Sequence, residues 1–234
     1  GKSDGLLNNR TVHLDYINET LFVGHDIGIS YTCQSDSFCN VSFPETSSPA
    51  NVSGVVLFED QLIVTTNGAG LFLLDLEKES LTPVEHSPKR IREVIVVDDR
   101  IYFATRNGLF FSNDLHRFQQ LSNTEDFSFS SILSRDKEIY GTTYGGLLLK
   151  ISASGKLDTL VDRENDPFRS VLIDDEGRIW VNSRNGVLIK KDEELIQLSE
   201  STGLPINDIN IVFNDLEGNV WLGTGGKGLS RFTG

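Results

Sequence analysis

Apolar residues along this chain occur in short runs of about four to six, each followed by a turn rich in Asn, Asp and Gly. In the stretch 94–121 the runs cover residues 94–97, 101–105, 109–112 and 117–121. Runs of this length with β-branched and aromatic residues are typical of β-strands, whereas helices would need longer runs at helical spacing. The stretch therefore predicts four antiparallel strands, A to D, joined by short turns.

The same unit recurs through the whole chain. A comparable B strand begins at Leu21, Leu62, Ile101, Ile139, Ile179 and Val220, so successive copies are 41, 39, 38, 40 and 41 residues apart. Four antiparallel strands in about 40 residues form one blade of a β-propeller. The sequence predicts an all-β fold, a β-propeller of six four-stranded repeats. We expect one domain over residues 1–234, with repeats at about 1–43, 44–85, 86–121, 122–161, 162–199 and 200–234.

The last repeat differs from the others. It reaches its third run at 229–232, and its outer strand is missing. Two explanations are open: residues 1–7 complete this blade, or the chain is a fragment of a seven-bladed or tandem propeller. Residues 4–9 align better with 202–207, the loop that enters the sixth repeat, than with an outer strand. This alignment favours a fragment.

Two A–B turns share the pattern Asp-x-Glu-Gly-x-apolar-Trp, at 174–180 and 215–221. A carboxylate in a tight turn accepts backbone N–H bonds, and glycine adopts positive φ there without strain. Trp180 and Trp221 would be buried between blades and would each need an acceptor for the indole N–H. We expect these residues to build the blades rather than to bind a ligand.

Together with the loop Gly-Leu-Pro-Ile-Asn-Asp-Ile at 203–209, the turn at 215–229 resembles the repeat of two-component regulator propellers. The sixth repeat matches almost completely and the fifth well, whereas repeats one to four keep the period and the glycine turn. The resemblance implies a periplasmic sensor region of a hybrid histidine kinase or a related signalling protein. In that family a small β-sandwich, a membrane helix and cytoplasmic signalling domains often follow, and none of them is in this chain.

The net charge of the chain indicates which classes of binding partner to expect. Lys and Arg number 21 against 34 Asp and Glu, a formal net charge of −13. Such an acidic chain repels nucleic acid and anionic membranes, so we expect neither partner.

No apolar run approaches the roughly 18 residues of a membrane span, and no signal peptide is recognisable. The chain begins Gly1-Lys2-Ser3, which suggests an excised soluble domain.

Cys33 and Cys39 flank a polar turn between two apolar runs, which would place the sulfurs across a hairpin. We predict a disulfide, and with it an oxidising compartment outside the cytoplasm, periplasmic or extracellular. The alternative is a pair of free thiols in a cytosolic protein. The spacing does not suit zinc, and the four histidines are scattered, so neither a metal site nor a cofactor is expected.

Propellers usually bind ligands with the loops at one end of the axis, where B–C turns and D–A connections meet. In this acidic chain several of those loops carry cations, with Asn and Tyr beside them. We predict a locally positive pocket for a carboxylate or sulfate, with aromatic faces for sugar rings. The candidate ligand-binding residues are Arg92, Arg106, Asn107, Tyr144, Arg169, Arg184, Asn185 and Lys227.

The function predicted from these features is extracytoplasmic sensing of a small ligand, an oligosaccharide or anionic sugar, without catalysis by this domain. Self-association is expected in the full-length protein because sensor kinases act as dimers. One alternative is a sialidase-like glycosidase or a propeller lyase, in which the arginines clamp a carboxylate. The other is an interaction or dimerisation scaffold without a small ligand. Short loops and the absence of a sialidase-like Arg-Ile-Pro element count against the enzyme.

Overall fold

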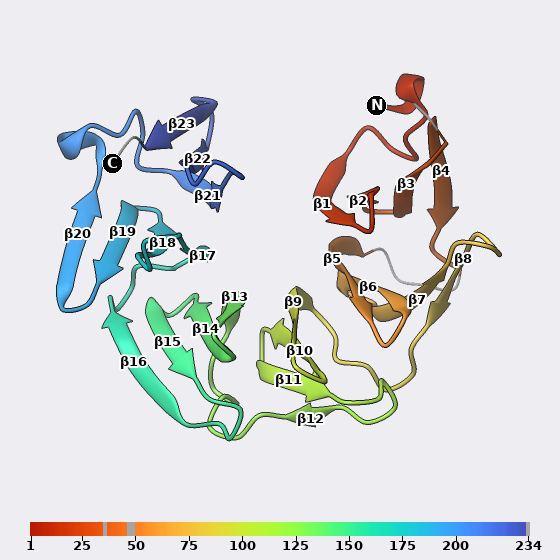
Figure 1. The fold of residues 1–234 in the computed structure, drawn as a ribbon, viewed down its shortest axis with the longest axis horizontal. Coiled ribbons are helices and arrows are strands. Elements are labelled where there is room, and N and C mark those ends of the chain that lie inside the picture. The colour runs from red at the N-terminus through yellow and green to blue at the C-terminus, as the bar shows by residue number, and fades with distance from the viewer. Residues whose placement is uncertain (35–36, 46–49, 233–234) are drawn as a thin grey trace. The chain divides into compact units, whose positions relative to one another are not determined.

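The structure is a computed structural model that describes residues 1–34, 37–45 and 50–232. Contacts divide the chain into two compact units, Gly1–Leu121 and Ser122–Gly234. Among the described residues each unit holds three antiparallel sheets, and every sheet keeps its strands in chain order (Figure 1). No helix of the described residues is both long and apolar enough to cross a membrane.

The first unit contains three four-stranded sheets. Blade 1 comprises β1 (Thr11–Ile17), β2 (Thr20–His25), β3 (Gly28–Gln34) and β4 (Ser37–Ser42). Blade 2 comprises β5 (Asn51–Phe58), β6 (Gln61–Asn67), β7 (Gly70–Asp75) and β8 (Ser80–Pro83). Blade 3 comprises β9 (Ile91–Val97), β10 (Arg100–Thr105), β11 (Gly108–Ser112) and β12 (Gln119–Gln120). A short 3-10 helix, η1 (Lys2–Asp4), precedes them.

The second unit contains two four-stranded sheets and one of three strands. Blade 4 comprises β13 (Phe129–Arg135), β14 (Glu138–Thr143), β15 (Leu147–Ile151) and β16 (Leu157–Asp162). Blade 5 comprises β17 (Ser170–Ile173), β18 (Ile179–Ser183), β19 (Gly186–Lys191) and β20 (Glu194–Leu198), and η2 (Glu200–Thr202) follows it. Blade 6 comprises β21 (Ile209–Asn214), β22 (Val220–Thr224) and β23 (Leu229–Phe232). The predicted six-repeat propeller is confirmed, including the incomplete last blade.

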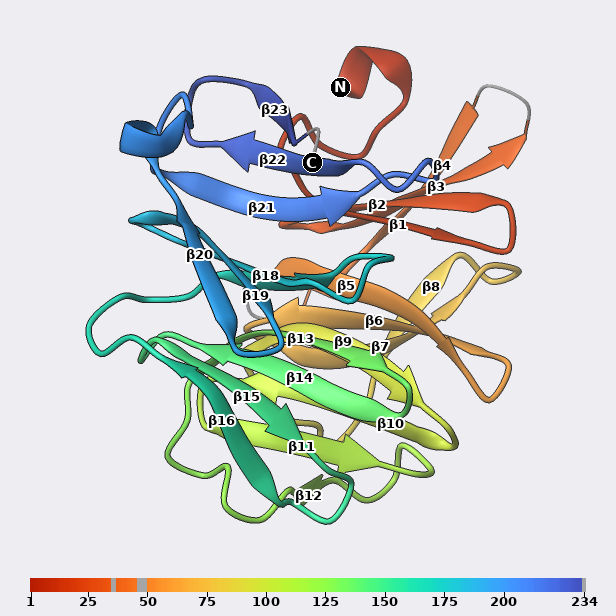
Figure 2. The same cartoon turned by 60° about the vertical axis from the view of Figure 1, so that its left-hand side comes forward.

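Blades within a unit pack face to face, as the stacked sheets of Figure 2 show. Successive residues of a strand point to opposite faces. On β6, Val64 joins the cluster shared with blade 1, whereas Ile63 joins the cluster shared with blade 3. On β18, Val181 faces blade 4 and Trp180 faces blade 6. The B strands are therefore apolar on both faces, and this produces the short continuous runs in the sequence.

The two Asp-x-Glu-Gly turns have the same geometry. Asp215 Oδ1 accepts the backbone N–H groups of Glu217 and Asn219 at 3.0 and 2.9 Å, and Oδ2 accepts Trp221 Nε1 at 2.7 Å. Asp174 Oδ2 likewise accepts Trp180 Nε1 at 2.7 Å. The sequence predicted that each indole needs an acceptor, and the structure shows that the acceptor is the aspartate six residues before it.

Hydrogen bonds control the ionisation of both aspartates. Those from Trp221 and Asn219 lower the pKa of Asp215 to about 2. Burial alone would raise the pKa of Asp174, but hydrogen bonds from Arg178 and Trp180 outweigh it, and the net pKa is lowered. The turn is completed by a glycine with positive φ, 77° at Gly177 and 81° at Gly218. These contacts fit the blade-building role predicted for the motif.

The loop that enters blade 1 repeats the loop that enters blade 6. Lys2 N–H donates to Asn9 Oδ1, and Glu200 N–H donates to Asn207 Oδ1, both at 2.7 Å. Each short helix ends at a left-handed glycine, with φ of 91° at Gly5 and 113° at Gly203. The alignment of residues 4–9 with 202–207 is confirmed, because both segments are blade-entry loops.

The predicted disulfide is present. Cys33 on β3 and Cys39 on β4 are bonded across the hairpin, with their Cα atoms 5.7 Å apart.

One expected strand is shorter than predicted: the D strand of blade 3 was expected over 117–121, but β12 covers only Gln119–Gln120. Asp114 Oδ1 accepts His116 N–H and Arg117 N–H, and this turn delays the start of the strand.

The lowered pKa of Asp215 predicts how stability depends on pH. Because its folded pKa of about 2 lies below the ordinary value of 3.8, its charge stabilises the fold above pH 3.8, and this contribution is lost as pH falls toward 2. We expect Asp215→Asn to lower the melting temperature at neutral pH, with a gap to wild type that narrows below about pH 4. Calorimetry across pH checks this.

Glu217→Gln in the same exposed turn is the matched control and should leave the melting temperature nearly unchanged, as is usual for surface substitutions. A gap between Asp215→Asn and wild type that stays constant down to pH 2.5 would show that the charge of Asp215 does not stabilise the blade.

Candidate functional site

The B–C turns and D–A connections form one face of each unit, called here its turn face. Hydrogen bonds join the two kinds of loop directly. In the first unit Lys89 Nζ donates to Ala69 O at 2.6 Å. In the second unit Tyr144 N–H donates to Ser128 O at 3.0 Å, and Gly225 N–H donates to Asp208 O at 2.8 Å. The expected adjacency of these loops is therefore confirmed within each unit.

A hydroxyl at the end of the B strand holds most of these turns. Thr105 Oγ1 accepts Asn107 N–H at 3.1 Å in blade 3, and Ser183 Oγ accepts Asn185 N–H at 3.0 Å in blade 5. In blade 6, Thr224 Oγ1 accepts Lys227 N–H at 2.8 Å. The turn backbone is thereby fixed, and the side chains that follow the hydroxyl are presented to solvent.

In the first unit, the predicted residues Arg106 and Asn107 lie exposed in the β10–β11 turn. Gln120 Nε2 donates to Asn107 O at 2.6 Å and holds this turn against the outer strand. Arg92 lies on β9 and is half-buried. The connection before β9 adds exposed Lys89 and Arg90. Lys89 was missed as a candidate, although its place in a D–A connection was a usable signal.

In the second unit, Arg184 and Asn185 lie exposed in the β18–β19 turn. Gln197 Nε2 donates to Asn185 O at 3.0 Å, as Gln120 does in blade 3. Tyr144, 39% exposed, lies in the β14–β15 turn, and Lys227 lies exposed in the β22–β23 turn. These four residues therefore occupy the places on the turn face that the repeat pattern predicted.

Arg169 has structural partners. Its Nη1 lies 2.6 Å from Asp208 Oδ1, and it also donates to Ile209 O at 3.1 Å and to Asn210 Oδ1 at 3.0 Å. These bonds tie the start of blade 5 to the start of blade 6. A ligand that contacts Arg169 would have to share or displace them. Its ligand-binding role stays a prediction.

His25 occupies the position at which the other five repeats have Ser or Thr. It is fully buried, with Nδ1 3.0 Å from Arg10 O and Nε2 2.9 Å from Ser30 Oγ. Ser30 Oγ also accepts Leu7 N–H at 2.9 Å. The histidine therefore anchors the entry loop to blade 1 and is not accessible to a ligand.

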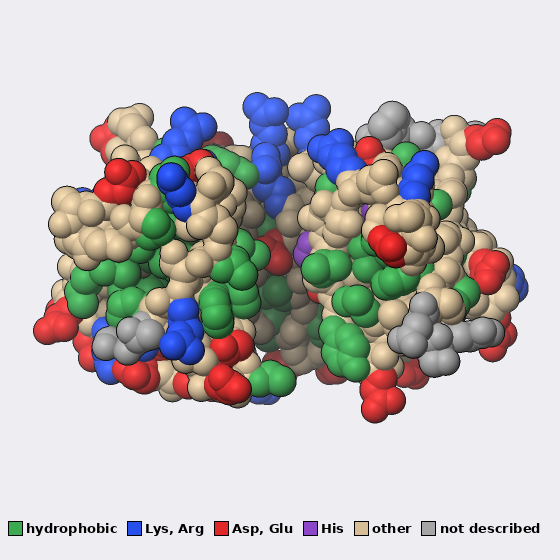
Figure 3. Space-filling view, turned by 90° about the horizontal axis from the view of Figure 1, so that it is seen from above, with side chains coloured by type: hydrophobic (Ala, Val, Ile, Leu, Met, Phe, Trp, Pro, Cys, Tyr) green, Lys and Arg blue, Asp and Glu red, His purple; other side chains and the backbone are tan. Residues whose placement is uncertain are grey.

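The A–B turns are predominantly acidic, whereas the turn face carries cations and acids together. In the first unit the A–B turns carry Glu19, Glu59, Asp60, Asp98 and Asp99, whereas the turn-face loops carry Arg10, Lys89, Arg90 and Arg106 beside Asp26 and Glu85. In the second unit the A–B turns carry Asp136, Asp175, Glu176 and Glu217 with the cations Lys137 and Arg178. Its turn-face loops carry Arg163, Arg169, Arg184 and Lys227 beside acids such as Asp126, Asp166 and Asp208. Figure 3 shows Lys and Arg side chains along one edge of the view, and Asp and Glu mainly along the other. The turn face is thus the more favourable side for an anion.

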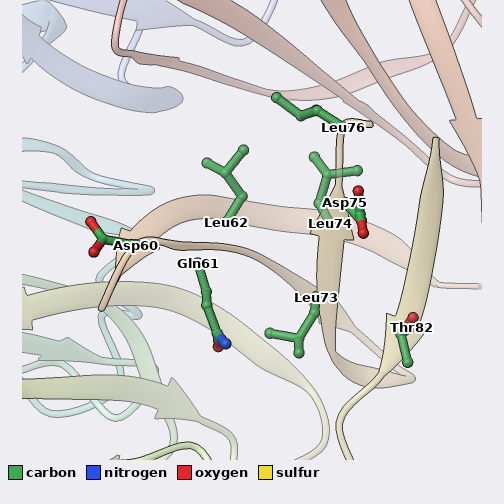
Figure 4. A pocket seen from close by; sticks show the side chains of 8 residues that line it. All are labelled: Asp60, Gln61, Leu62, Leu73, Leu74, Asp75, Leu76 and Thr82. Carbon is green, nitrogen blue, oxygen red and sulfur yellow. The ribbon is translucent and has the colours of Figure 1, made fainter. Parts of the chain in front are cut away.

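No candidate ligand-binding residue lines the hollows described below. One of about 450 Å³ lies at the acidic edge of blade 2 and is lined by Asp60, Gln61, Leu62, Leu73, Leu74, Asp75, Leu76 and Thr82 (Figure 4). Leu62 and Leu74 point to one side of the sheet, and Gln61 and Leu73 to the other. It is therefore an open hollow around the end of the sheet, and no predicted site residue lines it.

Within the part of the chain that the structure describes, no three His, Cys, Asp or Glu side chains form a group suited to a metal ion. His86 and His116 line a hollow of about 430 Å³ between blades 2 and 3. The side chains of the turn face offer hydrogen bonding and charge pairing by guanidinium, ammonium and amide groups.

No family model and no curated protein matches the chain. Among solved structures it resembles the extracellular domain of BT4673 from B. thetaiotaomicron, named as a one-component system. The identity is 24% and the TM-score 0.78, over 96% of this chain and 32% of that one. The extracellular domain of BT3049, named as a hybrid two-component system of the same organism, is 16% identical with TM-score 0.64, over 99% and 41% of the two chains. The chain thus spans about a third of the BT4673 structure.

An enzyme is also among the similar structures. Virginiamycin B lyase from Staphylococcus aureus, in a catalytically inactive variant that lacks one histidine, is 10% identical with TM-score 0.80. The match covers 97% of this chain and 82% of the lyase. At these identities the comparisons establish the propeller fold, which is shared by extracellular sensor domains and by lyases.

Proposed function

We propose that this chain is the ligand-sensing propeller of an extracytoplasmic signal transduction protein. In this proposal it binds an anionic oligosaccharide or anionic sugar at the turn face. The observation that carries the proposal is the set of exposed cations on these turns in a chain with a net charge of −13. Cations against an acidic background create a local field that favours carboxylate or sulfate.

The location rests on two further observations. The Cys33–Cys39 disulfide suits an oxidising compartment. The similar structures from B. thetaiotaomicron are extracellular domains of named signalling systems. In this proposal the signalling output lies in other domains, and self-association of the full-length protein transmits the response.

The turn side chains supply complementary chemistry. Guanidinium groups such as those of Arg106 and Arg184 bind carboxylate and sulfate with paired hydrogen bonds. The Asn107 and Asn185 amides offer donors and acceptors for sugar hydroxyls. The half-exposed ring of Tyr144 offers a flat apolar surface on which a sugar ring can pack. Because the B-strand hydroxyls already fix the turn backbones, ligand binding would order only side chains.

Calorimetric titration tests the proposal with tetragalacturonate, a sulfated chondroitin tetrasaccharide and neutral maltotetraose. We expect binding of at least one acidic probe in preference to maltotetraose. Arg106→Ala or Arg184→Ala, whichever lies in the unit that binds the probe, should weaken that binding by about tenfold or more, because it removes a charge-assisted hydrogen bond.

Lys191→Ala and Lys78→Ala remove exposed cations from strand β19 and from the β7–β8 turn, outside the turn faces, and are the matched controls. They should leave the affinity nearly unchanged. Absence of binding to all three probes by the folded chain would overturn the proposed ligand class, and equal losses from controls and test variants would overturn the proposed site.

A lyase is the second candidate, favoured by the match to virginiamycin B lyase. That enzyme loses activity when one histidine is replaced. Here His25 is buried, and His13 is held by Asp15, with Nε2 2.7 Å from Oδ2. His86 and His116 lie beside the hollow between blades 2 and 3.

We therefore expect the folded chain to leave quinupristin intact over hours, as followed by mass spectrometry. Ring opening at a rate that His86→Ala or His116→Ala abolishes would instead establish the lyase.

A further inference from the structure

The loop that enters blade 1, residues 1–10, is tied to the blade by a network of hydrogen bonds around the buried His25. The members of the network come from this entry loop and from strands β2, β3 and β4: Gly5, Leu7, Arg10, His25, Ser30 and Asn40. His25 and Ser30 are completely buried, so their side chains depend on partners within the network. The positions of the protons can therefore be counted bond by bond.

The bond from Asn40 to the entry loop fixes the orientation of its amide. Asn40 Nδ2 lies 2.9 Å from Gly5 O, and because a carbonyl only accepts, Nδ2 is the donor. Asn40 Oδ1 then lies 2.6 Å from Ser30 Oγ, and since an amide oxygen also only accepts, the hydroxyl proton lies on this bond. Ser30 has no second proton. Its oxygen therefore accepts from its other two partners, Leu7 N–H at 2.9 Å and the His25 ring.

The His25 ring must consequently donate at both of its nitrogens. Nε2 lies 2.9 Å from Ser30 Oγ, whose proton is already donated to Asn40, and Nδ1 lies 3.0 Å from the Arg10 carbonyl. Neither partner can give the ring a proton. A neutral imidazole has one N–H group, whereas the imidazolium has two. Only the protonated ring satisfies every bond of the network.

Either neutral form of His25 releases a carbonyl of the entry loop. With the proton on Nε2, the lone pair of Nδ1 faces Arg10 O and that bond is lost. With the proton on Nδ1, Ser30 turns its hydroxyl to Nε2, and Asn40 Oδ1 then faces an oxygen with no proton between them. Asn40 is exposed, so its amide can turn toward water and give up Gly5 O. Deprotonation therefore removes one tie to the loop in both cases.

Two opposing free-energy terms act on the charged ring. Complete burial removes its hydration, which favours the neutral form. The two charge-assisted hydrogen bonds favour the protonated form. Histidine is the side chain that changes charge between about pH 5 and 8, so pH is the variable that shifts this balance.

The other charged groups on the surrounding elements are few. Among the described residues β3, β4 and β5 carry none, and on β1 His13 Nε2 lies 2.7 Å from Asp15 Oδ2. In the turn after β2, Asp26 Oδ2 lies 3.7 Å from Arg10 Nη1. The remaining charges are at the exposed start of the loop: the Gly1 amine, Lys2 and Asp4. His13 is thus the second histidine that a test must separate from His25.

We propose that His25 is a pH-sensitive switch: the protonated ring holds the entry loop against blade 1, and the neutral ring releases it. The loop belongs to the turn face of the first unit, so its release changes the surface that this face presents. The other repeats have Ser or Thr at this position, and a hydroxyl there carries no charge to switch. The inference does not rest on the ligand proposed for the turn face.

Amide exchange of the folded chain between pH 5.5 and 8 tests the switch. The reporter is the protection factor of Leu7 N–H, which corrects for the intrinsic rise of exchange with pH. We expect it to fall at least tenfold as pH rises, while the ¹⁵N signals of the His25 ring change from two protonated nitrogens to one. Leu204 in the loop that enters blade 6 is the internal control, because its N–H donates to Ser199 O at 2.9 Å without a histidine nearby. Its protection factor should stay constant.

Two variants separate the network from other effects of pH. Asn40→Ala frees the Ser30 proton for Nε2 of a neutral ring, so the protection factor of Leu7 should lose its pH dependence. A merely structural role of Asn40 would lower the protection at every pH and keep the dependence. His13→Gln removes the other histidine of blade 1 and is the matched control, which should keep the tenfold change.

The proposal is overturned if the protection factor of Leu7 in the wild-type chain is the same at pH 5.5 and 8. It is also overturned if the pH dependence persists in Asn40→Ala or disappears in His13→Gln, since His25 and its network would then not be the cause. Should Asn40→Ala fail to fold, the ring signals of the wild-type chain decide. A single protonated ring nitrogen at pH 5.5, with the loop bound, contradicts the proton count.

Discussion

Two-sided burial of the B strands is the constraint on which the rest of the structure depends. Each of these strands has a neighbouring sheet on at least one face, and the central ones have one on both. Val64 and Ile63 on β6 are completely buried in opposite directions. Burial of each such side chain contributes about 1.5–3 kcal/mol, so a polar substitution at either residue would affect a blade interface. The A–B and B–C turns do not need apolar side chains on both faces.

The aspartate of the A–B turn satisfies a polar group in the blade, the indole N–H of the following Trp. An indole N–H buried without an acceptor would destabilise the blade. Asp174 accepts the hydrogen bond of Trp180 and also closes the turn. One carboxylate therefore accepts hydrogen bonds from the turn backbone and from a core side chain. The residues of the motif that most clearly characterises the repeat thus have structural roles in the blade. In the proposed function, the turns at the other end of the blades recognise the ligand.

Much of this arrangement could be predicted from the sequence, because it is local. The period placed the strands, and the hairpin around Cys33 and Cys39 brought the sulfurs together. The position of each B–C turn followed from the end of an apolar run, so Arg106 and Arg184 were placed on the turn face from sequence alone.

The remainder depends on contacts between distant residues. Arg169 bonds to Asp208, which lies 39 residues further along the chain, and no local pattern reveals that pairing. His25 is buried, because it stands at the position of the Ser or Thr that ends the B strand in the other repeats. A position-by-position alignment of the repeats would have exposed that substitution. The shortened β12 follows from the Asx turn at Asp114, a local signal that the apolar run at 117–121 concealed.

The central claim is that the repeats build a scaffold and the turn face binds the ligand. The most direct measurement is backbone amide exchange of the folded chain with and without the acidic oligosaccharide that binds most tightly. Slower exchange on the turn face of one unit, at residues 106–108 or at residues 184–186 and 225–228, with unchanged exchange at the A–B turns 98–99 and 175–177, is the predicted result. Slower exchange confined to those A–B turns would contradict the claim.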